Sequence, residues 1–139
     1  MRSACAVFLA ILLATAAHAQ SDTPRAIVNL EGPIAAAQVD MLMYALEPTL
    51  EHQNDAVETR AWAKKRLEPA LKDALAFAAG KPVAADAIRA YHAAAMAYLD
   101  AAVPTPTPEA QATALRLKGD MEAKEKSMHE SLRAAGLWK

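Results

Sequence analysis

Cysteine is the residue whose scarcity excludes most. The chain has one cysteine, Cys5, and it lies within the first nineteen residues. The rest of the sequence therefore cannot form a disulfide, use a thiol as a nucleophile, attach a c-type haem covalently or build a cysteine-ligated zinc or iron–sulfur site. The stability of the domain must come from helix packing, either alone or together with a non-covalent ligand.

Aromatic and β-branched residues are also scarce, and these are the residues that strands prefer. Aromatic side chains make up 5% of the chain, whereas alanine, which has the highest helix propensity, is very common. Leucine, methionine, glutamate, lysine and arginine, which follow alanine in helix propensity, supply much of the rest. The composition predicts an all-α domain.

An excess of basic charge is missing as well. The chain has 15 lysines and arginines against 16 aspartates and glutamates, whereas proteins that bind nucleic acids carry a clustered basic surplus. We therefore expect no nucleic-acid partner. The one long apolar run, AVFLAILLA at residues 6–14, is too short to span a bilayer, so we expect no transmembrane segment.

That apolar run is part of a signal-peptide pattern. It follows a positive start at Met1-Arg2 and precedes the small-x-small site Ala17-His18-Ala19. The pattern predicts a signal peptide over residues 1–19, cleaved between Ala19 and Gln20. The mature protein is then expected to be periplasmic or secreted.

After the signal peptide we expect an extended lead-in over residues 20–32 and a four-helix bundle over residues 33–139. Pro33 suits the first turn of a helix, which would run to about residue 52 on an apolar stripe of Val39, Leu42, Leu46 and Leu50. The other helices are predicted over residues 55–79, from residue 82 to before Pro104, and from residue 108 to near residue 136. Similar lengths and short connections favour an antiparallel up-down-up-down topology.

The boundaries of the later helices have clear local signals. Gly80 is a left-handed C-terminal cap, Pro82 opens a helix, and Thr107 caps the last helix with Pro108 at its first position. These residues divide the second half of the chain into its predicted helices.

The last predicted helix has an apolar stripe with one carboxylate in it. Met121 and Met128 lie seven residues apart on this stripe, so we expect both in the core. Glu125 falls between them and would need a partner if buried. His129 follows one turn later, so the two side chains could share a metal ion or form a partly exposed pair.

A second candidate site is a basic run beside a tryptophan. Trp62 precedes Lys64, Lys65 and Arg66, and Trp138 lies near the carboxyl end. These residues could contact an acidic partner or a membrane surface; a solvated basic face is the simpler interpretation.

The inventory of reactive groups does not indicate an enzyme. Residues 20–139 contain three serines and no glycine-rich phosphate loop, no H-E-x-x-H and no E-x-x-H pair. We therefore predict a small exported, non-catalytic binding or interaction protein without a cofactor. Its partner would be another protein, a small ligand or a second copy of the chain.

An alternative comes from the overall plan, which resembles the periplasmic four-helix cytochromes of the b562 type. The resemblance implies haem b held by a methionine of the first helix and a histidine near the end of the fourth. Met43 and His129 are the residues that would match. Met43 follows the start of the first predicted helix, and His129 precedes the end of the fourth, by similar numbers of residues, so in an antiparallel bundle both would lie at a similar height along the bundle axis. Met41 points away from the predicted stripe. Copper is the other ion that such ligands could bind.

Overall fold

The computed structural model describes residues 22–139, which form four α-helices and no strand. The helices are α2 (Arg25–Leu46), α3 (Leu50–Phe77), α4 (Pro82–Ala101) and α5 (Pro108–Ala134). This confirms the predicted all-α helical bundle. The predicted signal peptide and its cleavage site lie outside the described residues.

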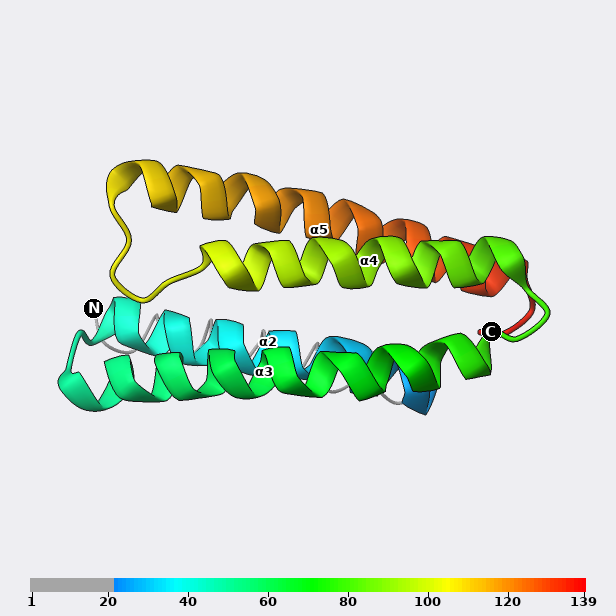
Figure 1. The fold of residues 1–139 in the computed structure, drawn as a ribbon, viewed down its shortest axis with the longest axis horizontal. Coiled ribbons are helices and arrows are strands. Elements are labelled where there is room, and N and C mark those ends of the chain that lie inside the picture. Colours follow the sequence, from blue (N-terminus) through cyan, green and yellow to red (C-terminus); the bar gives the residue numbers. More distant parts are fainter. Residues whose placement is uncertain (1–21) are drawn as a thin grey trace.

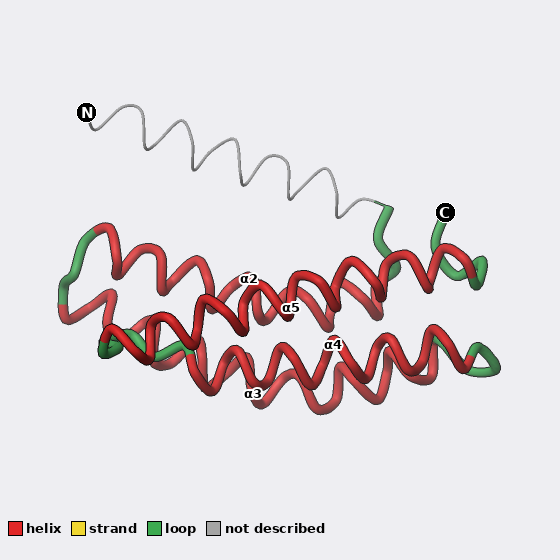
Figure 2. Tube along the Cα trace, turned by 90° about the horizontal axis from the view of Figure 1, so that it is seen from above, coloured by secondary structure: helices red, strands yellow, loops and turns green. Residues whose placement is uncertain are grey.

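The helices share one long axis and are joined at alternating ends of the molecule (Figure 1). Backbone contacts are densest within two pairs, α2 with α3 and α4 with α5, so the bundle consists of two helical hairpins packed together. The tube in Figure 2 shows the same arrangement from above, with short connections at both ends. No helix in residues 22–139 combines the length and apolarity that crossing a membrane requires.

Local signals set the boundaries of the last two helices as predicted. Pro82 begins α4, and the Thr107 side chain caps α5 by accepting a hydrogen bond of 3.2 Å from the backbone nitrogen of Ala110. Gly80, at the turn before α4, has a φ of 77°. That left-handed conformation favours glycine because it has no Cβ.

The start of α2 contradicts the predicted lead-in. The helix begins at Arg25, and Pro33 lies inside it as a buried residue. Residues 25–32 are therefore helical, and only residues 22–24 precede the helix within the described chain. The segment is helical because it continues an apolar stripe at helical spacing, which crosses the boundary predicted at Pro33. The members of this stripe are all buried: Ile27, Leu30, Ile34 and Ala37.

The end of α2 differs too. The helix ends at Leu46, and Thr49 caps α3 by accepting a hydrogen bond from the backbone nitrogen of His52. The break falls at Pro48, which cannot donate a helical hydrogen bond. The predicted stripe was wrong: its four members, Val39, Leu42, Leu46 and Leu50, are all exposed. Met41, expected to point away, packs against the core.

The core combines alanines with about as many larger apolar residues. Met121 and Met128 are buried, as predicted from the stripe of α5. Tyr91 and Tyr98 are buried on α4, where they supply the volume that its many alanines lack. None of the described residues with a charged side chain is fully buried. The charged side chains that lie closest to the core are therefore only partly buried.

Candidate functional site

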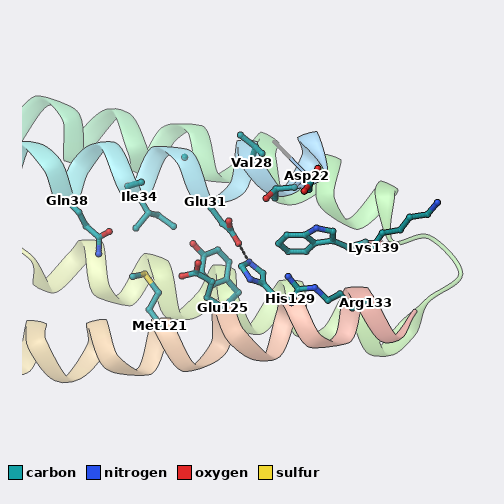
Figure 3. Close-up of a pocket in the computed structure, with 15 residues that line it drawn as sticks. Asp22, Val28, Glu31, Ile34, Gln38, Met121, Glu125, His129, Arg133 and Lys139 are labelled. Carbon is teal, nitrogen blue, oxygen red and sulfur yellow. Dashed lines mark hydrogen bonds and ion pairs between the residues drawn. The ribbon is translucent and has the colours of Figure 1, made fainter. Parts of the chain in front are cut away.

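Because α2 begins at Arg25, Glu31 lies within this helix and faces the end of α5. The His129 ring nitrogen Nε2 contacts a Glu31 carboxylate oxygen directly, in a pair that is about four-fifths buried. The two residues are 98 positions apart in the sequence, so the contact joins the first and last described helices. The dashed line in Figure 3 marks it.

Glu125 adds a second carboxylate to this pair. It precedes His129 by one turn of α5, so both side chains emerge on the same face. One potential ligand atom each from Glu31, Glu125 and His129 lie within 4.8 Å of one another. Figure 3 shows the three side chains converging from α2 and α5. Burial, and then the Glu31 charge, raise the pKa of Glu125, while His129 acts in the opposite direction.

Tyr91 of α4 completes the inner side of the group. The residue is 1% exposed, and it lines the same cavity as the two carboxylates. Burial, followed by the charges of Glu31 and Glu125, raises the pKa of the Tyr91 hydroxyl. The hydroxyl therefore keeps its proton and can donate a hydrogen bond toward this site.

Trp138 packs against the His129 ring on the side away from Glu31. Its indole packs edge-on against the His129 imidazole, with ring centroids 4.6 Å apart and planes at 72°. The Arg133 guanidinium lies 4.3 Å from the centre of the Trp138 ring, at cation–π distance. The carboxyl-terminal residues thus hold the imidazole in one orientation.

These groups line a cavity of about 480 Å³ between α2, α4 and α5. Its wall carries Glu31, Glu125, His129 and Tyr91, with Met121 and Ile34 as apolar neighbours. Polar and charged side chains share this lining with the apolar ones. Concave sites in which a few polar groups converge are a usual form of ligand site in proteins. Arg133 and Lys139 also line the cavity, but Glu31 and Glu125 place two carboxylates within reach of one another and of the His129 imidazole. Two carboxylates held together favour a cation between them.

The structure does not bring Met43 and His129 together. His129 meets α2 at Glu31, and Met43 lies twelve residues further along the same helix, which corresponds to about 18 Å at 1.5 Å per residue. Two side chains that ligate one haem iron must reach the same ion. The match to the b562-type cytochromes depended on a first helix beginning at Pro33, and the earlier start of α2 removes that coincidence.

The residues predicted as a partner contact separate into different surroundings. Trp62 and Arg66 are exposed and line a shallow groove between α2 and α3. Lys64 forms an ion pair with Asp100 of α4, and Lys65 is exposed. Trp138 lies at the carboxylate–histidine cavity. Lys64 therefore serves the packing of α3 on α4, and Trp138 belongs to the other site.

Sequence reasoning found Glu125 and His129 as a pair but missed Glu31 and the role of Tyr91. Glu31 could have been found from the spacing of Ile27, Leu30 and Ile34. This spacing predicts a helix that begins before Pro33, and in that helix Glu31 lies next to the buried face. Comparisons with protein-family models, with curated proteins and with solved structures found no match to this chain.

Proposed function

We propose that this chain is a small exported, non-catalytic binding protein whose ligand site is the cavity between α2, α4 and α5. In this proposal the mature protein is an antiparallel up-down-up-down bundle released by cleavage of a signal peptide after Ala19. The observation that carries the proposal is the convergence of Glu31, Glu125 and His129 on one cavity. The charge of this group makes a cation the expected class of ligand.

Folding alone gives no reason for this arrangement. The Glu31–His129 pair already satisfies a partly buried imidazole and carboxylate. Glu125 adds a second negative charge that this pair does not require, on a helix face that otherwise contributes Met121, Met128 and Leu132 to the core. Like charges close together in a partly dry site destabilise a fold. A residue that opposes folding while lining a cavity fits a role in binding.

The stability of the ligand-free protein tests this. Glu125→Leu removes the charge and extends the apolar stripe of α5, so we expect it to raise the free energy of unfolding by about 0.5–2 kcal/mol. The matched control is Glu130→Leu, at an exposed position on the same helix, where we expect a change within about 0.5 kcal/mol. Urea denaturation of both variants and the wild type gives the comparison.

A loss of stability in Glu125→Leu that exceeds the change in Glu130→Leu would show that Glu125 supports the fold, and the proposed site would then be rejected. Export is tested separately. The intact mass of protein recovered from an exporting host should correspond to a chain beginning at Gln20, and a product that retains residues 1–19 would contradict the proposed localisation.

A further inference from the structure

We propose that the cation bound in this cavity is a divalent transition-metal ion of the Zn²⁺ type, ligated by Glu31, Glu125 and His129. This inference rests on the ligand site proposed above and specifies its ligand. The three side chains supply two carboxylate oxygens and one imidazole nitrogen. A fourth ligand position would face the cavity and would be filled by water or by a small molecule.

The distances between the ligand atoms suit an ion of this size. Zinc lies about 2.0–2.2 Å from carboxylate oxygens and imidazole nitrogens in a tetrahedral shell, so its ligand atoms lie about 3.3–3.6 Å from one another. The three ligand atoms here are already within 4.8 Å of one another. Small rotations of the side chains would therefore bring all three into coordination distance without movement of the helices.

The two carboxylate oxygens and one imidazole nitrogen favour some metal ions over others. Imidazole suits zinc, copper, iron and nickel, and carboxylates broaden the site toward manganese. Calcium requires six to eight oxygen ligands and magnesium keeps an octahedral shell rich in water, so a site with two carboxylates and a histidine favours neither. The three proposed ligands include no thiolate or thioether, which are the ligands that copper(I) prefers; the Met121 thioether lines the same cavity but is part of the packed core.

Tyr91 provides the second, independent observation. Its hydroxyl lies on a residue that is 1% exposed, lines this cavity, and has no hydrogen bond to another described residue. The hydroxyl is therefore open to the cavity rather than enclosed in the core, and a polar group in such a place normally finds a partner. A protonated hydroxyl beside two carboxylates is the kind of outer-shell donor that orients metal ligands. Trp138 and Arg133 orient the histidine from the other side.

Titration of the exported protein, after removal of metal with a chelator, tests the proposal. By isothermal titration calorimetry we expect one Zn²⁺ per chain and no comparable binding of Ca²⁺ or Mg²⁺. Glu31→Gln, Glu125→Gln and His129→Gln should each weaken Zn²⁺ binding by at least about tenfold, because even outer-shell partners contribute about 10–100-fold.

Two matched controls accompany these variants. His52→Gln alters a histidine that also pairs with a glutamate, Glu47, at 3.5 Å on the surface. Glu130→Gln alters the residue directly after His129. Both should bind Zn²⁺ as the wild type does. Circular dichroism of each metal-free variant establishes that it is folded.

A second measurement keeps the wild-type ligands intact. The chain has two tryptophans, and Trp138 touches His129 while Trp62 lines a different groove. Bound Co²⁺ quenches nearby tryptophan fluorescence. We expect saturable quenching in Trp62→Phe, where Trp138 is the reporter, and much weaker quenching in Trp138→Phe.

The proposal is overturned if the wild type binds no Zn²⁺, if the three ligand variants bind as tightly as the controls, or if Co²⁺ quenches the two tryptophans equally. Such a result leaves the broader ligand site to be judged by the stability of Glu125→Leu. If Glu125→Leu is stabilised and Zn²⁺ does not bind, the cavity takes another kind of ligand. If Glu125→Leu is destabilised and Zn²⁺ does not bind, both proposals fail.

Discussion

Two histidines in this bundle occupy contrasting surroundings. His129 contacts Glu31 across the cavity, whereas the side chain of His92 is 12% exposed and its buried Nε2 has no hydrogen-bond partner among the described residues. The nearest carboxylate, that of Glu68, is 4.0 Å away. Burial lowers the pKa of His92, and the Glu68 charge acts in the opposite direction. This burial arises because α4 turns the His92 side chain toward α3, on which Glu68 lies.

The His92 environment predicts a pH dependence of stability. In the unfolded chain His92 takes up a proton below about pH 6.5, its ordinary value. In the fold its pKa is lower, so between the two values the unfolded state binds more protons and stability falls as the pH falls. The loss is at most about 1.4 kcal/mol per pH unit in that window.

Thermal unfolding at pH 7 and pH 5 would measure this. We expect His92→Leu to lose less stability on acidification than the wild type, whereas His52→Leu, at the surface pair with Glu47, should follow the wild type. Equal losses in all three proteins would show that His92 does not contribute to the pH dependence.

At the scale of elements, the parts of the fold that local chemistry decides could be predicted from the sequence. Pro82, Thr107 and Gly80 fix helix ends through one residue each, and the stripe of α5 is regular enough to show its buried face. The ends of α2 and the start of α3 could not be predicted from such local signals. Pro33 can open a helix or lie within one, and the choice depends on the burial of Ile27, Leu30 and Ile34 against other helices.

The candidate site shows the same division. Glu125 was identifiable because a carboxylate interrupts the apolar stripe of α5, and His129 because it follows one helical turn later. Glu31 could not be assigned to the site from a segment whose sequence predicts an extended lead-in. Its pairing with His129 depends on how two hairpins dock, which no local pattern encodes.

The caps can be tested at the same scale. Thr107→Ala removes the side-chain acceptor for the backbone nitrogen of Ala110, and we expect it to lower the free energy of unfolding by about 0.5–2 kcal/mol. Thr105→Ala is the control, since this exposed residue of the connection caps no helix. Chemical denaturation measures both. Equal, small effects of the two changes would mean that the hydrogen bond to Thr107 adds little to the stability of α5.

At the scale of the whole molecule, the contacts between the two hairpins are fewer than those within them. The α3–α4 contact is less extensive than either hairpin, and polar side chains reinforce it. The Arg60 Nη2 donates to the Asp100 carbonyl at 3.0 Å, and its Nε donates to the Leu99 carbonyl. Lys64 pairs with the Asp100 side chain. On the other side, Glu31 and His129 join α2 to α5.

Arg60 is the residue through which this assembly can be tested. Its guanidinium satisfies two carbonyls at the carboxyl end of α4, groups that a helix leaves without internal partners, and its charge is favourable at that end of the helix dipole. We expect Arg60→Ala to lower the free energy of unfolding by about 1–3 kcal/mol in urea denaturation. Arg66→Ala, at an exposed position six residues further along α3, should change it by no more than about 0.5 kcal/mol. Arg60→Lys should fall between them, because a single ammonium keeps the charge but cannot reproduce the planar fork that reaches both carbonyls. If Arg60→Ala were as mild as Arg66→Ala, apolar packing alone would hold the hairpins together.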